Sequence, residues 1–275
     1  MRITALALAV SWTLVAAPDG LAQPPGQGPA GDAVRQGVRL DLDGKYDEAR
    51  ELFAKALETA ASPQAQAQAL RSMAMSYGFE AKCKDAVTYE ARLYQIYLTT
   101  NDFFNAGEIA NELARLCIDA GDLDEAQKWY TNGHDAGLRE PNIAPARVDL
   151  WNFRWEHAQG RLAARRGNKA EAQKHVAAAK AILDKNTNPD QQIFFPYLVG
   201  YVALYGGDYP TALAELQKAN QSDPFILCLI AQTYEKMSDQ AHALEFYKKA
   251  LGAANAHNPP TAYARPLAKR KLGVS

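Results

Sequence analysis

The sequence lacks the short motifs by which common catalytic and metal sites are recognised. Its 275 residues contain no GxxxxGK[ST] phosphate loop, no GxSxG nucleophile turn, and no HExxH or CxxC metal motif. The histidines are few and none has metal-ligand spacing; they are His134, His157, His175, His242 and His257. Without convergent reactive groups, we expect a protein that is not an enzyme and that carries no metal and no cofactor.

An excess of charge and a long apolar run beyond the N-terminus are also missing. The 30 Lys and Arg residues nearly balance the 31 Asp and Glu residues, so the net charge is −1 and nucleic acid gains no global attraction. After residue 22, no apolar stretch approaches the roughly 20 residues that span a bilayer. We therefore expect no nucleic-acid partner and no membrane span after signal cleavage.

Cysteine is scarce, with only Cys83, Cys117 and Cys228 in the chain. An odd number means that at least one thiol has no intramolecular partner. Two states remain open. One is a Cys83–Cys117 disulfide, which an oxidising compartment permits, and the other is three reduced, packed thiols. We favour the three reduced thiols.

The N-terminal stretch MRITALALAVSWTLVAAPDGLAQ is typical of a secretory signal peptide. It has one basic residue, Arg2, then an apolar segment of about 15 residues, which is shorter than a membrane span, and small residues before Gln23. We predict a signal peptide over residues 1–22, a flexible Pro/Gly-rich leader over 23–30, and the folded chain from residue 31. The short signal and the scarce cysteines favour the bacterial periplasm, with secretion as the alternative.

What the chain has instead is a recurring pattern of small residues. An alanine follows a turn-like Gly and polar stretch at intervals of 37, 40, 46, 40 and 31 residues; these positions are Ala49, Ala86, Ala126, Ala172, Ala212 and Ala243. A period of this length indicates a helical repeat array. A second set of small residues precedes each turn and lets two helices cross closely; they are Gly37, Ala74, Ala114, Gly160, Gly200 and Ala231. We predict an all-α helical-repeat solenoid of about six antiparallel helix pairs.

The pattern resembles the tetratricopeptide repeat. The segment FILCLIAQTYEKMSDQAHALEFYKKAL, residues 225–251, has small and aromatic residues at that family's positions, which are Ala231, Tyr234, Ala243, Tyr247 and Ala250. The resemblance covers six units over residues 31–257. It is weaker in units two and four; in unit two, Ala81 replaces the turn Gly and Glu90 replaces the aromatic residue. In the C-terminal segment 258–275, residues 261–272 are expected to form a capping helix that covers the apolar end of the stack.

The resemblance implies that the first helix of each unit lines a concave binding groove. On that register, Arg, Asn and His side chains from units three and four lie beside a tyrosine stripe from unit five; the set is Asn111, Arg115, Arg154, His157, Arg161, Arg165, Tyr197, Tyr201 and Tyr205. Arg can hold a carboxylate through two parallel hydrogen bonds, and Tyr supplies flat contact area. A solvated face balanced by nearby acids is the alternative for the Arg residues. For the tyrosines, cover by another part of the chain is favoured over cover by a partner.

These features predict a non-catalytic protein- or peptide-binding scaffold or adaptor of the cell envelope, which binds through the concave groove. The expected partner is a protein or peptide that is acidic or has a free C-terminal carboxylate. The alternative is a soluble binder of a small anionic or aromatic ligand, held between units four and five. Because a groove-facing side chain makes few core contacts, we expect Arg161→Glu to weaken binding without unfolding the protein.

Overall fold

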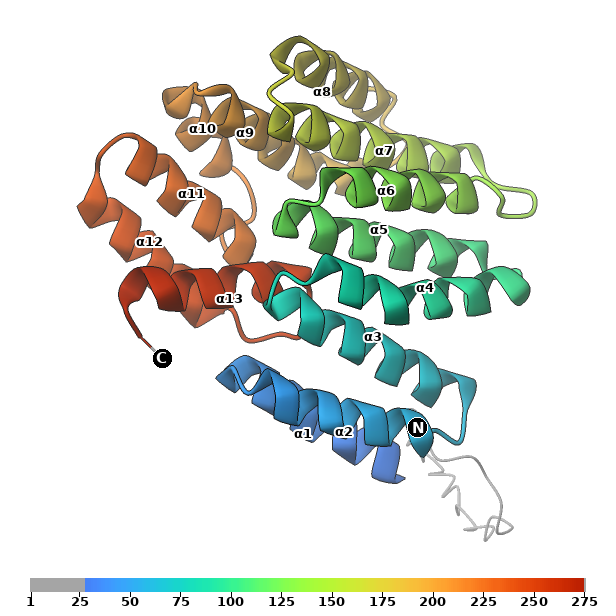
Figure 1. Ribbon diagram of the computed structural model, residues 1–275. Coiled ribbons are helices and arrows are strands. Elements are labelled where there is room, and N and C mark those ends of the chain that lie inside the picture. The colour runs from blue at the N-terminus through green and yellow to red at the C-terminus, as the bar shows by residue number, and fades with distance from the viewer. Residues whose placement is uncertain (1–27, 275) are drawn as a thin grey trace, which may run out of the picture.

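The computed structural model describes residues 28–274, which fold into thirteen α-helices and one short 3-10 helix, with no β-strand in that range (Figure 1). The predicted signal peptide and most of the predicted leader lie outside the described residues. Twelve helices form six pairs: α1 (Gly28–Asp43) and α2 (Tyr46–Glu58), α3 (Pro63–Phe79) and α4 (Cys83–Thr99), α5 (Phe103–Ala120) and α6 (Leu123–Gly137), α7 (Pro145–Arg165) and α8 (Lys169–Leu183), α9 (Phe195–Gly206) and α10 (Tyr209–Leu216), and α11 (Pro224–Lys236) and α12 (Gln240–Ala253). The 3-10 helix η1 (Pro189–Phe194) precedes α9, and α13 (Pro259–Leu272) is the last helix.

The pairs pack side by side into a solenoid. The two helices of each pair contact each other, and each pair contacts the next. In Figure 1 the pairs from α1 to α8 form one stack, and α9 to α12 curve round one side of it. Each pair buries its apolar faces against its neighbours, as helical repeat arrays do. The prediction of an all-α helical-repeat fold is confirmed.

Small residues allow the paired helices to approach closely. All six recurring alanines have 0% of their surface exposed. A Cβ added at Gly37 would lie 2.5 Å from the Phe53 ring, and one added at Gly200 would lie 2.6 Å from Leu216 Cγ. These separations are far below the normal contact distance between carbon atoms. The small residues therefore occupy positions where the helices of a pair cross.

A left-handed residue makes the turn inside each pair. Gly44 and Gly121 have φ values of +86° and +89°, a conformation that glycine adopts without steric cost. Ala81 in unit two and Ser238 in unit six take the same position with φ values of 57° and 63°. Unit two therefore has the same turn geometry as the other units, although Ala81 replaces glycine there.

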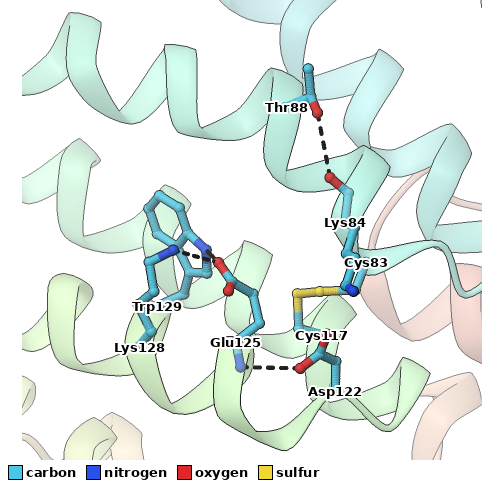
Figure 2. Close-up of a disulfide and its surroundings, with 8 residues drawn as sticks. All are labelled: Cys83, Lys84, Thr88, Cys117, Asp122, Glu125, Lys128 and Trp129. Carbon is cyan, nitrogen blue, oxygen red and sulfur yellow. Dashed lines mark hydrogen bonds and ion pairs between the residues drawn. A yellow bond between two sulfur atoms is a disulfide. The ribbon is translucent and has the colours of Figure 1, made fainter.

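A disulfide joins α4 to α5, and the expectation of three reduced thiols is wrong. Cys83, the first residue of α4, is bonded to Cys117 of α5, and Cys228 is free and buried (Figure 2). The spacing of the cysteines left this pairing open, because only packing brings the start of one helix against the last turns of the next. Figure 2 also shows Asp122, whose carboxylate caps the start of α6 by accepting a hydrogen bond from the Glu125 backbone N–H.

Helix α13 does more than cover the end of the stack. It packs on α11 and α12 as predicted, but it also contacts α3 and α5, and Figure 1 shows it beside α3. His257 Nε2 lies 2.8 Å from the fully buried Asp41 Oδ2, which also brings the end of α1 into the contact. Arg265 donates to the backbone carbonyls of Leu42 and Ala254. The C-terminal segment therefore connects the last unit of the solenoid to the first.

Candidate functional site

A cavity of about 410 Å³ lies between the first helices of units three, four and five. It is on the side of the solenoid that carries α13, because Pro259 forms part of its wall. Its lining combines charged, amide and aromatic side chains from five elements: Glu108, Asn111, Glu112 and Arg115 of α5, Tyr130 of α6, Phe153, Arg154, His157 and Arg161 of α7, Gln191 and Phe194 of η1, and Tyr197 of α9.

The buried Arg161 and the half-buried Arg115 form the positive part of the cavity. The Arg161 side chain is 6% exposed and donates to the hydroxyl oxygens of Tyr130 and Tyr197, at 2.9 and 3.2 Å. The Arg115 guanidinium lies 4.8 Å from the centre of the Phe225 ring, and its Nε and Nη2 are buried without a hydrogen-bond partner. Within residues 28–274, no carboxylate oxygen lies within 4.0 Å of either guanidinium. The cavity therefore holds two cations that lack a close counter-charge.

The acidic lining residues are already engaged. Glu108 pairs with Arg154 across the gap between α5 and α7. Glu112 accepts two hydrogen bonds from the Nε and Nη2 edge of Arg71. Both carboxylates therefore have arginine partners other than Arg115 and Arg161.

Burial sets the protonation of the groups around these arginines. It lowers the pKa of His157 well below its usual value, and the nearby Arg161 lowers it further, so the imidazole is neutral at neutral pH. Burial raises the pKa of Tyr197 to about 12, which keeps its hydroxyl protonated. Asp119, one turn from Arg115, has its pKa raised to about 6 by burial, against the opposing effect of Arg115, Arg161 and Arg165. The positive charge around the cavity therefore belongs to the arginines.

The mouth of the cavity is partly apolar. Phe194, which lines it, is 42% exposed, and the adjacent Ile193 is 58% exposed. They are two of the large hydrophobic residues that the described chain leaves most open to solvent. A ligand entering here would cover part of that apolar surface.

Six of the nine predicted site residues line this cavity, namely Asn111, Arg115, Arg154, His157, Arg161 and Tyr197. The other three lie outside it, further along α7 and α9. Arg165 donates to the Tyr201 hydroxyl at 3.3 Å and stacks over the Tyr205 ring at 5.1 Å. That any of the nine residues binds a ligand remains a prediction.

The tyrosine face of α9 is covered by the chain itself. Tyr201 is 1% exposed, and Tyr197 packs edge-on against Phe225 of α11. Tyr205 borders a small cavity that is also lined by Tyr263 and Leu267 of α13. The favoured expectation, that another part of the chain covers these rings, is correct for this face.

The expectation that Arg161 makes few core contacts is wrong. Its side chain is buried and bonded to two tyrosine hydroxyls, because α6 and α9 approach α7 from both sides. Reversing its charge would therefore disturb packing as well as binding. The repeat register also missed Pro259 as a lining residue, since α13 is not part of any repeat.

Residues 28–274 contain neither a metal-binding cluster nor a membrane-spanning helix. No group of three or more His, Cys, Asp or Glu side chains is placed to hold a metal ion in this part of the chain. None of the helices described there is both long enough and apolar enough to cross a membrane.

Comparisons with known proteins identify the repeat. Residues 226–257 match the family model described as tetratricopeptide repeat. The photosystem I assembly protein Ycf3 of Synechococcus sp. (strain CC9902) is 26% identical over 129 residues, which are 46% of this chain and 73% of that protein.

Similar solved structures also contain this repeat. The TPR-like repeats of a kinesin light chain from Podosopora anserina are 17% identical, with a TM-score of 0.43 over 82% of this chain and 96% of that one. The TPR2AB domain of yeast Sti1, in its pHSP90 complex, is 13% identical, with a TM-score of 0.35 over 89% of this chain and 98% of that one. Residues 226–257 therefore match a tetratricopeptide repeat, and the five other helix pairs share the buried alanine and the left-handed turn of this unit.

Proposed function

We propose that this protein is a non-catalytic scaffold of the cell envelope that binds a protein or peptide through the inner side of its solenoid. In this proposal, an acidic side chain or a C-terminal carboxylate of the partner enters the cavity between α5, α7 and α9. The tetratricopeptide-repeat fold is one of protein-interaction scaffolds, and such arrays bind through extended concave surfaces.

The observation that carries the proposal is a pair of arginines without a carboxylate partner, the buried Arg161 and the half-buried Arg115. Removing a guanidinium from water is unfavourable unless an anion or several hydrogen bonds replace the lost hydration. Arg161 has two phenol oxygens and the His157 backbone carbonyl in place of an anion, and Arg115 has two N–H groups with no acceptor. A carboxylate from a partner would supply charge-assisted hydrogen bonds to both.

Export is supported by the chain's own chemistry. The N-terminal segment has the pattern of a signal peptide. The Cys83–Cys117 disulfide is a bond that persists in oxidising compartments and is rare in reducing ones. Both features favour the periplasm or the exterior as the place where the scaffold works.

Affinity capture from the native envelope tests the scaffold. Immobilised protein should retain a partner that Arg115→Gln no longer retains, while Arg166→Gln retains it as well as the wild type. Arg166 is a suitable control because it is an exposed arginine at the C-terminal end of α7 and pairs with Asp124, away from the cavity. Equal retention by Arg115→Gln would show that the cavity is not the contact site, and no specific partner in any sample would remove the scaffold proposal.

A small anionic or aromatic ligand is the second candidate, and two extra walls of the cavity favour it. Phe194 of η1 and Pro259 of α13 add walls that an open groove would lack. The volume of about 410 Å³ falls within the range of small-molecule sites. A thermal shift screen separates the two candidates, because a tight ligand raises the melting temperature by mass action.

A further inference from the structure

We infer that the group taken up by the cavity between α5, α7 and α9 is an aromatic carboxylic acid. Its carboxylate would bind Arg115 and Arg161, and its ring would lie against the aromatic lining. The inference rests on the proposed function, since it assigns chemistry to the same cavity. Two sources share this chemistry, a free small acid and the C-terminal aromatic residue of a chain.

The arrangement of hydrogen-bond donors favours a planar anion with two oxygens. Arg71 holds the Glu112 carboxylate through its Nε and Nη2 atoms. The same Nε and Nη2 edge of Arg115, one turn further along α5 from Glu112, has no partner. This edge is shielded from solvent, so a rotation of the side chain must turn it toward a ligand. A carboxylate matches the edge through two parallel hydrogen bonds, which a single hydroxyl cannot do.

The charge balance favours a single negative charge. Of the charged lining residues, Glu108, Arg154 and Glu112 already have partners, which leaves Arg115 and Arg161. Asp119 and Asp223 act on Arg115 only from beyond salt-bridge distance. Burial keeps His157 neutral, so it adds no third cation. One ligand carboxylate and the more distant Asp119 charge together balance the two arginines.

The aromatic lining accounts for the ring. Phe153 is 2% exposed, and His157 and Tyr197 lie with their ring centres 4.9 Å apart. Phe194 stands partly exposed at the mouth. Aromatic rings that meet offset or edge-on are more favourable than their buried area alone predicts. A ligand ring between these side chains would gain that contribution and cover Phe194.

The position of α13 decides how much of a ligand can enter. The helix lies across the inner side of the solenoid against α3, α5 and α11, and its first residue, Pro259, borders the cavity. An extended peptide that ran along the inner side would meet α13 at this point. A small acid or the end of a chain therefore fits the cavity better than an internal segment of a peptide.

Three matched probes test the chemistry on the purified protein: hydrocinnamate, its primary amide hydrocinnamamide, and cyclohexanepropionate. Isothermal titration calorimetry should show that hydrocinnamate binds and that the amide binds at least about tenfold more weakly, because the charge-assisted pair is lost. Replacing the aromatic ring by cyclohexyl should weaken binding roughly two- to tenfold. Arg115→Gln should lose about tenfold or more in affinity for hydrocinnamate, and Arg166→Gln should match the wild type.

Circular dichroism checks that Arg115→Gln is folded. If Arg115→Gln is not folded, Arg115→Lys replaces it. This variant keeps the charge but lacks the two parallel N–H donors of the guanidinium, so it should still weaken hydrocinnamate binding. A hexapeptide, Gly-Ser-Gly-Ser-Gly-Phe, distinguishes the two sources of the acid. Tighter binding of this peptide than of hydrocinnamate, lost on C-terminal amidation, identifies a chain end; weaker binding identifies a free acid.

The inference is overturned if acid and amide bind equally, if Arg115→Gln binds hydrocinnamate like the wild type, or if neither hydrocinnamate nor the peptide binds. The envelope capture described above separates this failure from that of the scaffold. Capture that depends on Arg115 without any hydrocinnamate binding keeps the scaffold and discards the aromatic acid. Probe binding without a captured partner keeps the aromatic acid and discards the scaffold.

Discussion

Replacing both Cys83 and Cys117 by alanine measures what the disulfide between α4 and α5 contributes to stability. The bond closes a loop of 34 residues. For a loop of this size, the chain-entropy treatment gives a loss of about 4 kcal/mol when the bond is removed. Domains of ordinary stability unfold with about 5–15 kcal/mol, so the loss is a large fraction of the total. Both sulfur positions are almost fully buried, and alanine fits there without introducing a polar group.

Urea unfolding followed by circular dichroism provides the measurement, with the oxidised wild type as reference. We expect the double variant to unfold at lower urea and to lose about 3–4 kcal/mol, because its unfolded chain regains the freedom that the bond removes. Thiol titration in denaturant should find one reactive thiol in the wild type, that of Cys228. A loss below about 1 kcal/mol, or three reactive thiols, would refute the reasoning.

Three other predictions concern pH, helix crossing and the closure by α13. Folding raises the pKa of Asp119 from 3.8 to about 6, so the folded state binds the Asp119 proton more tightly than the unfolded state does. The stability that this proton binding contributes at low pH is lost as pH rises from about 4 to 6. Asp119→Asn should therefore be more stable than the wild type at pH 7 by at most about 3 kcal/mol and should lack this pH step in urea unfolding; an equal step in both proteins would reject the assignment. Gly200→Ala should cost roughly 1–3 kcal/mol in thermal unfolding, since its Cβ would overlap a neighbouring side chain, whereas Gly206→Ala, with open space around it, should be nearly neutral. His257→Ala should cost roughly 1–3 kcal/mol, because it takes one hydrogen-bond partner from the fully buried Asp41, and hydrogen exchange should rise in α13 and α1 together; a rise in α13 alone would argue against the contact.

The amino-acid sequence by itself determined the helix pairs and most of the inner lining. Each unit buries its alanine at the predicted position, and the turns of units two and six keep the left-handed geometry with Ala81 and Ser238 in place of glycine. An α-helix has 3.6 residues per turn, so once a small residue identifies the face that packs on the partner helix, the residues on the opposite face follow from their spacing. For this reason the repeat register predicts Asn111, Arg115 and Arg161 on the inner side, where they line the cavity.

Only the tertiary structure decided how the array closes. His257 and Asp41 are 216 residues apart in the sequence, and a similar number of residues separates Arg265 from Leu42, to whose carbonyl it donates. The curvature that brings them together accumulates from small rotations between successive pairs, and no local pattern encodes the sum. The same long-range packing paired Cys83 with Cys117, buried Arg161 between two tyrosine hydroxyls, and turned an expected open groove into a walled cavity.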